Sequence, residues 1–284
     1  MSVPARERSP RPAGGEIPLP DAAFRAIAAR IHALTGIVLR DHKRQMVSTR
    51  LGRRLRALGL ADYDSYLALL DGPQGAAETV ELINALTTNL TSFFREAHHF
   101  ADLRAAVIAP RIAARAGRLR IWSAGCSTGE EPYSIQMTML EAGALDRPWD
   151  YRLLATDLDS AVLARAEAGV YAADRLAGVP PALRAGAFRA RPDGSFEVVP
   201  ALKAAVRFRR LNLLDPWPFR GPFDAIFCRN VLIYFDAATK AALVDRFAEM
   251  LTPDGTLYLG HSESLLGDHP RLRPCGRTIY RRRA

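Results

Sequence analysis

The segment Ser123–Glu131, Ser-Ala-Gly-Cys-Ser-Thr-Gly-Glu-Glu, has the residue types of a ligand-binding turn. Its two glycines, Gly125 and Gly129, would let the backbone pass close to a ligand before a helix begins. The turn is neither a dinucleotide fingerprint nor a P-loop, since no lysine follows Gly129. Glu130 and Glu131 would repel a phosphate at the start of that helix. The turn therefore favours a ligand that is cationic or rich in hydroxyl groups, and an ordinary tight turn is the alternative.

Polar residues also follow four other apolar segments, at the points where parallel strands would end. They are Asp157 with Asp159, Asn212, Arg229 with Asn230, and Gly260 with His261. In an open parallel sheet, ligands bind beyond the carboxyl ends of the strands. In such folds an acid at the position of Asp157 binds a ribose diol, whereas Asp159 is the better candidate for a helix N-cap. Together these positions predict an adenosine-bearing cofactor without a terminal phosphate, and S-adenosyl-L-methionine fits.

The positive charge of the chain is concentrated in one segment. Of 284 residues, 39 are lysine or arginine and 30 are aspartate or glutamate, which gives a net charge of +9. Residues 40–56 hold seven of the basic residues and one acid. On a helix, Lys43, Arg50 and Arg54 would fall within a narrow arc beside an apolar stripe. A local basic stripe indicates an anionic partner, and a solvated helix face is the ordinary alternative.

No metal or disulfide site is predicted. The three cysteines are widely spaced and odd in number, which gives neither a disulfide framework nor a paired Cys-X-X-Cys ligand set. Glu96, His98 and His99 contain metal-ligating groups, but adjacent histidines should point in different directions on a helix. We interpret these three residues as helix surface.

Composition places the chain among globular proteins. Hydrophobic residues make up 49% and charged residues 24%, which excludes a wholly disordered chain, a coiled coil or a fibre. Residues 1–20 hold five prolines and are expected to form a disordered tail. No apolar run reaches the ~18 residues of a membrane span, and the N-terminus lacks the apolar core of a signal peptide. We therefore expect a cytoplasmic protein without direct membrane insertion.

Two periodicities divide the rest of the chain, and they define the elements that must position these residues. Residues 21–90 are predicted to be helical, with Gly36 and Gly59 each ending an element. Residues 91–284 form the second predicted domain, in which strands and helices alternate from Leu119 onward, as in a mostly parallel sheet covered by helices. Residues 171–205 break the alternation with several prolines and are predicted to form a small inserted subdomain. The expected strands are 119–123, 151–156, 206–211 and 223–228, with 256–260 and 278–282 as a closing pair.

Several longer motifs occur in a fixed order along the chain. They are Asn89-Leu-Thr-Ser-Phe-Phe-Arg-Glu96, Trp122-Ser-Ala-Gly-Cys-Ser-Thr-Gly-Glu-Glu-Pro-Tyr-Ser134, Ala155-Thr-Asp-Leu-Asp159, Phe223-Asp-Ala-Ile-Phe-Cys-Arg-Asn-Val-Leu-Ile-Tyr-Phe235 and Gly260-His-Ser-Glu263. These motifs, and the basic segment from Asp41, resemble the chemotaxis receptor methyltransferase (CheR) family over about residues 21–283. The resemblance implies an α/β fold: a Rossmann-like S-adenosylmethionine-dependent methyltransferase sheet with a small inserted β-subdomain, preceded by an all-α N-terminal receptor-recognition domain.

The resemblance also implies an activity. The family transfers a methyl group from S-adenosyl-L-methionine to glutamate side chains of methyl-accepting chemotaxis receptors, giving γ-glutamyl methyl esters and S-adenosyl-L-homocysteine. A glutamate with a pKa of about 4.3 is already a nucleophilic carboxylate at neutral pH, so no general base is required. The cofactor contacts implied by the family's motifs are Asn89, Thr91, Arg95, Glu131, Asp157, Asn212, Leu213, Arg229 and Asn230.

Two residues, Arg95 and Tyr234, are predicted to be catalytic by orienting the attacking carboxylate. A full ion pair with Arg95 would weaken the nucleophile, so we assign Arg95 a positioning role. Tyr234 also fits a core aromatic position, judged from its sequence context alone. The residues expected to contact glutamate-rich cytoplasmic receptor helices are Lys43, Arg50, Arg53 and Arg54.

Two other functions fit parts of the sequence. A nucleic-acid methyltransferase would share the fold and the cofactor, and the basic segment is its main argument. That segment has no interleaved aromatic residues for base stacking, so no nucleic-acid partner is expected. A non-catalytic receptor-binding module would also share the fold, but the retained Arg95, Asp157, Asn230 and Tyr234 argue against it.

One segment departs from the family's pattern. Relatives that bind the C-terminal pentapeptide of a receptor use a glycine-rich loop of the inserted subdomain. The corresponding segment here, Phe188–Phe196, is shorter and contains Gly194 as its one glycine. We therefore do not expect pentapeptide tethering.

Overall fold

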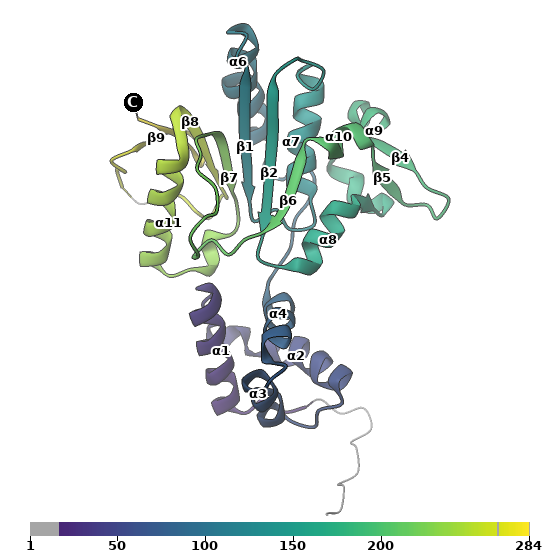
Figure 1. Cartoon of the computed structure of the whole chain (residues 1–284), viewed down its shortest axis with the longest axis vertical. Coiled ribbons are helices and arrows are strands. Elements are labelled where there is room, and N and C mark those ends of the chain that lie inside the picture. Colours follow the sequence, from purple (N-terminus) through teal and green to yellow (C-terminus); the bar gives the residue numbers. More distant parts are fainter. Residues whose placement is uncertain (1–16, 266, 284) are drawn as a thin grey trace, which may run out of the picture. The chain divides into compact units, whose positions relative to one another are not determined.

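The structure is a computed structural model that describes residues 17–265 and 267–283. Most of the tail predicted for residues 1–20 lies outside the described residues. The described chain forms two compact units (Figure 1). One contains the residues up to Leu34 together with Val38–Leu86, and the other contains Thr35–Ile37 together with the residues from Thr87 onward.

The first unit is helical, as predicted. Its helices are α1 (Asp21–Thr35), α2 (Arg44–Leu58), α3 (Tyr63–Asp71) and α4 (Gly75–Leu86), and a 3₁₀ turn, Asp41–Lys43, precedes α2. Their apolar faces meet in a core that buries Ile27, Leu51, Tyr66 and Leu82 completely. Burying side chains of this size contributes about 1.5–3 kcal/mol each.

Helix α3 lies within the predicted helical region but was not assigned as a separate element, although its signals are present. Asp62 is its N-cap and accepts a 2.8 Å hydrogen bond from the backbone N–H of Ser65. Tyr63, Tyr66 and Leu70 recur at helical spacing and are all buried. Because two of these three residues are tyrosines, a search for recurring aliphatic residues does not detect the pattern.

The second unit is built around a sheet of parallel and antiparallel strands. Among the described residues, seven strands pair in the order β6-β2-β1-β7-β8-β10-β9. The pairs from β6 to β8 are parallel, and β10 pairs antiparallel with both β8 and β9. The bounds are β1 Arg118–Ala124, β2 Asp150–Asp157, β6 Val206–Arg210, β7 Phe223–Cys228, β8 Leu251–Leu259, β9 Leu272–Gly276 and β10 Ile279–Arg282. The predicted closing pair is therefore confirmed, and β9 is an additional strand.

Helices cover both faces of this sheet (Figure 1). Because side chains alternate along a strand, Ile121 of β1 joins one buried cluster and Trp122 joins the other. The helices that follow the strands are α7 (Glu130–Glu141), α8 (Ser160–Ala168) and α11 (Ala237–Met250). Before β1 the chain forms an irregular helix, of which only the part around His98 and His99 was expected: α5 (His98–Asp102), a π-helical segment (Leu103–Ile108) and α6 (Ala109–Ala113).

The insertion predicted at 171–205 is a separate small sheet, in which the described strands pair antiparallel in the order β3-β5-β4. The strands are β3 (Val170–Tyr171), β4 (Phe188–Ala190) and β5 (Phe196–Val198). The short helices α9 (Pro181–Ala187) and α10 (Pro200–Ala204) flank the β4–β5 hairpin, and a 3₁₀ segment, Ala173–Gly178, follows β3. The hairpin turns tightly, with the N–H of Arg191 bonded to the carbonyl of Ser195 at 2.9 Å.

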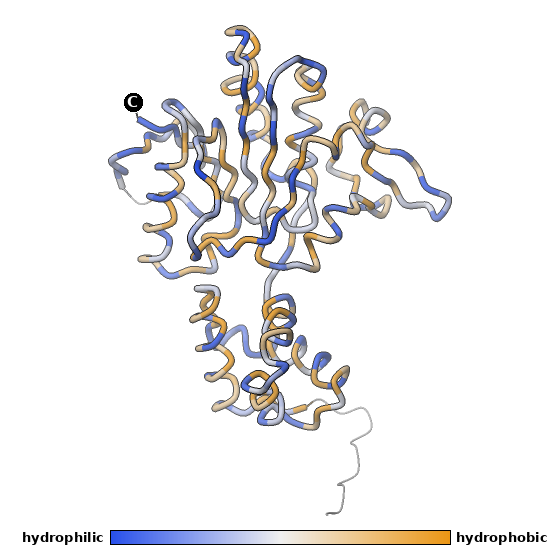
Figure 2. Tube along the Cα trace, viewed as in Figure 1, coloured by the Kyte–Doolittle hydropathy of each residue, from blue (hydrophilic) through white to orange (hydrophobic). Residues whose placement is uncertain are grey.

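Hydrophobic and hydrophilic residues alternate along the helices of both units (Figure 2). This is the pattern of helices that are buried on one side only. Within residues 17–265 and 267–283, no helix is both long enough and apolar enough to span a bilayer.

Candidate functional site

The carboxyl ends of four parallel strands lie in register at one edge of the main sheet. Ala124 of β1 pairs with Thr156 of β2, and Asp157 pairs with Arg210 of β6. On the other side of β1, Ser123 pairs with Phe227 of β7. The chain leaves β1 toward β2 on one side and later returns to β7 on the other. Ligands of open α/β sheets bind at such a reversal of strand order.

Asp157 joins the turn after β1 to the loop after β2. One carboxylate oxygen accepts the backbone N–H of Ser127 at 2.8 Å, and the other accepts that of Asp159 at 3.0 Å. Burial raises the pKa of Asp157 to about 6. Asp159 caps α8, as expected, through 2.8 and 3.2 Å bonds from the N–H groups of Ala161 and Val162. The remaining lone pairs of Asp157 fit hydroxyl donors such as those of a ribose.

The residues at the end of β6 continue this edge. The N–H of Leu211 bonds to the carbonyl of Asp157 at 2.9 Å, which sets the following residues beside the acid. The side-chain oxygen of Asn212 accepts the N–H of Leu214 at 3.2 Å, and its amide nitrogen donates to Asp215 at 3.2 Å. Leu213 is buried in the core cluster beneath. Asn212 is thus held in one orientation by its own loop.

Glu131 and Arg229 form a buried ion pair between α7 and the end of β7. The Arg229 guanidinium donates to Glu131 at 3.0 Å, and Ser123 Oγ donates to the other carboxylate oxygen at 2.7 Å. Burial raises the pKa of Glu131, although Arg229 and Ser123 oppose that shift. Arg229, whose side chain is 2% exposed, also donates to the backbone carbonyl of Arg95. This arginine therefore fixes the backbone that carries a predicted catalytic side chain.

Residues 87–95, which we call the bridging segment, hold the two predicted catalytic residues together. The Arg95 guanidinium donates to the carbonyl of Leu90 at 2.9 Å, and the Tyr234 hydroxyl donates to the carbonyl of Thr88 at 3.3 Å. Tyr234 is partly exposed, so the alternative of a core aromatic is wrong. The carbonyls of Thr88 and Leu90 are two residues apart on this segment. Their hydrogen bonds therefore bring Tyr234 and Arg95 to the same part of the sheet edge.

The bridging segment is itself fastened to the turn after β1 and to α8. Asn89 donates its amide to Asp159 at 2.7 Å, and Thr87 donates its hydroxyl to the same oxygen at 2.8 Å. Ser127 Oγ donates to the carbonyl of Asn89 at 2.9 Å. The carbonyl of Thr91 accepts a 3.0 Å bond from Arg175. The predicted contacts Asn89 and Thr91 therefore lie over the turn, in a segment with a fixed course.

Glu263 is a site residue that the sequence reasoning did not assign. Its buried carboxylate accepts the N–H groups of Gly260 at 2.6 Å, Asn230 at 2.7 Å and Ile233 at 3.1 Å. Burial raises its pKa, and these hydrogen bonds oppose the shift. The carboxylate holds Asn230 in a left-handed conformation, with φ +59°. An acid three residues after a strand-end glycine was the available signal.

The interpretation of Glu96, His98 and His99 as helix surface holds for His98, which is exposed on α5, and is wrong for His99 and for Glu96, which precedes the helix and is half-buried. His99 is fully buried, and one ligand atom from each residue lies within 4.8 Å of the others. The two rings lie in the first turn of α5. His98 Nε2 lies 3.0 Å from the carbonyl oxygen of Arg277, and His99 Nε2 lies 3.1 Å from the hydroxyl of Thr278. The Arg229 guanidinium lies 3.6 Å from Glu96 and already places a positive charge there. That charge disfavours a metal cation.

The predicted basic stripe extends from the 3₁₀ turn, which holds Lys43, into α2, and only part of it is free of partners among the described residues. Arg54 forms 2.9 and 2.6 Å bonds to the two carboxylate oxygens of Glu78, which is buried and also accepts the Tyr66 hydroxyl at 2.9 Å. Arg50 donates to the carbonyl of Ala85 at 3.3 Å. Lys43 and Arg53 are exposed, and the described residues supply no partner for either. A helical projection from sequence cannot distinguish a cation that is paired within the fold from one that is exposed.

The Arg54–Glu78 pair gives the first prediction. Replacing Arg54 by alanine is expected to lower the free energy of unfolding by about 2–4 kcal/mol, because Glu78 would keep its charge in a buried position without its partner. Urea denaturation of the full chain measures the change. Arg53→Ala is the matched control on the same helix and is expected to change stability by less than about 0.5 kcal/mol. Equal effects of the two substitutions would contradict a structural role for Arg54.

The side chains at the sheet edge fit the adenosine-bearing cation predicted from the sequence. Glu130 and Glu131 occupy the first turn of α7, where a phosphate would otherwise bind. Asp157 and Asn212 supply a ribose acceptor and a polar group from neighbouring strands. Gly129, with φ +96°, starts α7 in a conformation that favours glycine. The edge suits adenosine joined to a cationic group rather than a nucleotide.

Comparisons with known proteins agree with this chemistry. The family described as "CheR methyltransferase, SAM binding domain" matches residues 89–281, and "CheR methyltransferase, all-alpha domain" matches residues 22–87. The chain is 45% identical over 266 residues to the chemotaxis protein methyltransferases of Salmonella typhimurium and Escherichia coli. These matches cover 92% of this chain and 90% and 91% of those proteins. It is 44% identical over 262 residues to chemotaxis protein methyltransferase 2 of Pseudomonas aeruginosa, with 90% of this chain and 91% of that protein covered. The chain therefore belongs to the CheR methyltransferase family, whose cofactor is S-adenosyl-L-methionine.

Proposed function

We propose that this methyltransferase acts on glutamate side chains of the cytoplasmic helices of methyl-accepting chemotaxis receptors. The products are γ-glutamyl methyl esters and S-adenosyl-L-homocysteine. The names of the relatives, chemotaxis protein methyltransferases, support the assignment to chemotaxis. The observation that carries the glutamate specificity is the arginine–tyrosine pair on the bridging segment, because a guanidinium and a hydroxyl together suit a carboxylate.

The cofactor supplies an electrophilic methyl carbon when it is bound. We assign Asp157 to the ribose hydroxyls and Asn212 with Leu213 to the adenine. Thr91 and Arg95 are assigned to the methionine end. Glu131 and Arg229 are assigned to support this end, since their buried ion pair fixes both side chains. The full proposed set is Asn89, Thr91, Arg95, Glu131, Asp157, Asn212, Leu213, Arg229 and Asn230.

The transfer needs alignment more than proton movement. The glutamate oxygen forms a bond to the methyl carbon as the carbon–sulfur bond breaks, and the electron pair of that bond stays on sulfur. No proton changes place, so the protein has to hold the attacking oxygen in line and exclude water. Arg95 and Tyr234 are placed for the first task. Their anchoring to carbonyls of one segment limits how far either side chain can move.

The proposal is tested by supplying S-adenosyl-L-methionine with a labelled methyl group to receptor-containing membranes and, in parallel, to RNA and DNA. We expect label in the receptor band and release of the label as methanol in mild base, because carboxyl methyl esters are base-labile. Membranes with every candidate glutamate replaced by alanine are the matched control. Label in nucleic acid, or base-stable label on the receptor, would contradict the proposal.

Cofactor binding is expected to depend on pH through Asp157. With a pKa of about 6, this carboxylate is ionised above that pH and accepts ribose hydroxyls. Below it, the protonated acid loses acceptor capacity, so the affinity for S-adenosyl-L-homocysteine should fall from pH 8 to pH 5. Asp157→Asn should bind the ligand about 5–150-fold more weakly at pH 8, which corresponds to ~1–3 kcal/mol. Calorimetry across this range measures both effects. The same pH dependence in the variant would remove Asp157 from the site.

A further inference from the structure

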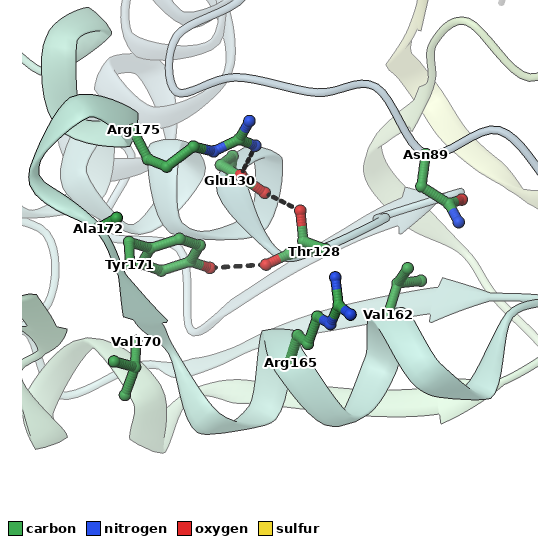
Figure 3. Close-up of a pocket in the computed structure, with 9 residues that line it drawn as sticks. All are labelled: Asn89, Thr128, Glu130, Val162, Arg165, Val170, Tyr171, Ala172 and Arg175. Atoms are coloured by element: carbon green, nitrogen blue, oxygen red, sulfur yellow. Dashed lines mark hydrogen bonds and ion pairs between the residues drawn. The ribbon is translucent and has the colours of Figure 1, made fainter. Parts of the chain in front are cut away.

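A polar pocket of about 430 Å³ lies beside the bridging segment. It is formed by that segment, the start of α7, the exposed side of α8 and the chain around β3 (Figure 3). The lining residues are Asn89, Thr128, Glu130, Val162, Arg165, Val170, Tyr171, Ala172 and Arg175. All belong to the second unit.

The polar side chains on the inner wall of the pocket already have hydrogen-bond or ion-pair partners. Glu130 accepts the Thr128 hydroxyl at 2.6 Å and forms an ion pair with Arg175. The Tyr171 hydroxyl donates to the carbonyl of Thr128 at 2.7 Å. These contacts, drawn as dashed lines in Figure 3, leave the wall without net charge. An occupant gains little from replacing them.

Arg165 is the group that distinguishes the pocket. It projects from α8 into the space between α8 and Thr128 (Figure 3). Nothing in the described parts of the chain, 17–265 and 267–283, pairs with its guanidinium. Val162 and Val170 flank it with apolar surface. A single unpaired guanidinium beside short apolar side chains suits one carboxylate on an aliphatic stem.

The pocket lies close to the predicted catalytic pair. Asn89 lines it, and the carbonyls of the two adjacent residues, Thr88 and Leu90, are the ones that hold Tyr234 and Arg95. Asn89 is thus one residue away from each of these two carbonyls, and neighbouring Cα atoms are roughly 3.8 Å apart. A helix that presents one side chain to the pair presents others on the same face one and two turns along, at roughly 5 and 11 Å.

We propose that this pocket binds a second acidic side chain of the receptor helix, one to two turns from the glutamate that is methylated, with Arg165 as its counter-ion. The inference rests on the proposed function. It assigns substrate recognition to the catalytic unit itself, in addition to the basic helix α2. It also accounts for the absence of an acidic partner for Arg165 among the described residues of its unit.

The test compares Arg165→Glu with Arg147→Glu. Arg147 is also exposed and is unpaired in the described chain, but it lies before β2 begins, at the opposite edge of the sheet from the pocket. Both variants therefore change the net charge equally. We expect Arg165→Glu to raise the KM for receptor membranes by at least about 10-fold, equivalent to ~1.4 kcal/mol. The kcat and the affinity for S-adenosyl-L-homocysteine should stay at the wild-type values. A wild-type KM, or an equal rise with Arg147→Glu, would overturn the inference.

A charge exchange identifies the partner residue. Each receptor acid one or two turns from a methylated glutamate is replaced by lysine and tested against both enzymes. At one such position, the lysine receptor should be a poorer substrate for the wild-type enzyme and a better one for Arg165→Glu. Rescue at no position would reject the pocket assignment. Absence of receptor methylation by the wild-type enzyme would reject the proposed function instead, so the two failures remain distinct.

Discussion

Replacement of Arg95 by alanine is expected to lower kcat for receptor methylation by about 10²–10³-fold, the usual cost of removing a group that positions or stabilises the reacting atoms. The fold should persist. The Arg95 side chain is partly exposed and makes a single described hydrogen bond, to the carbonyl of Leu90. Its backbone carbonyl, which accepts Arg229, is retained in the variant.

Single-turnover transfer measures the loss, with circular dichroism and urea denaturation to verify folding. Arg95→Lys is the matched control. It retains the charge but not the planar fork that can hold a carboxylate at two points, so its activity should fall between those of wild type and Arg95→Ala. Retention of more than half the activity by a folded Arg95→Ala variant would show that the carboxylate is positioned elsewhere.

Replacement of Arg229 by methionine is expected to have the largest effect on stability, about 3–5 kcal/mol. The substitution keeps an unbranched side chain of similar length but removes the charge that Glu131 and Glu96 face. Glu131 would then be ionised in a buried position, with Ser123 as its one side-chain donor among the described residues. Breaking a buried pair from one side leaves the desolvation penalty of the other charge without its compensation.

The size of this effect should depend on pH. Burial already raises the pKa of Glu131, and loss of Arg229 should raise it further. A carboxyl group whose pKa is raised by folding binds more protons in the native state, so its contribution to stability is lost as the pH rises through the native pKa. Arg229→Met should therefore be less destabilised at pH 5 than at pH 8.

Urea denaturation at both pH values tests this sign. In the double variant Arg229→Met with Glu131→Gln, the difference between pH 5 and pH 8 should become much smaller. A destabilisation of Arg229→Met that is equal at both pH values would indicate lost packing rather than an uncompensated charge.

The strand ends were predictable because they depend on local pattern. An apolar run followed by Asp157, or by Arg229 and Asn230, indicates both a strand and the residue at which it ends. The parallel topology of the sheet then brings these strand ends to one edge. The partners of the side chains were not predictable in the same way. Nothing local indicates that Arg229 pairs with Glu131, 98 residues earlier, or that Glu263 would bind the N–H of Asn230.

Helix α2 also shows that the partner of a side chain cannot be predicted from local sequence. Charge and periodicity correctly place Arg50 and Arg54 on one helix, but the acid that binds Arg54 lies on α4. The prediction for the adjacent histidines failed for a related reason. The rule that they point apart holds within a regular helix, whereas His98 and His99 start a short one whose neighbours come from the far end of the chain.

Those neighbours have a consequence for synthesis on the ribosome. His99 and Asp102 lie early in the catalytic unit, yet they bond to Thr278 and Arg281, 179 residues later in each case. The helical unit contains no residue beyond Leu86. A growing chain can therefore complete its helical unit while the buried face of α5 is still uncovered, because β10 has not yet been synthesised. The buried face of α5 is therefore covered only after β10 has been translated.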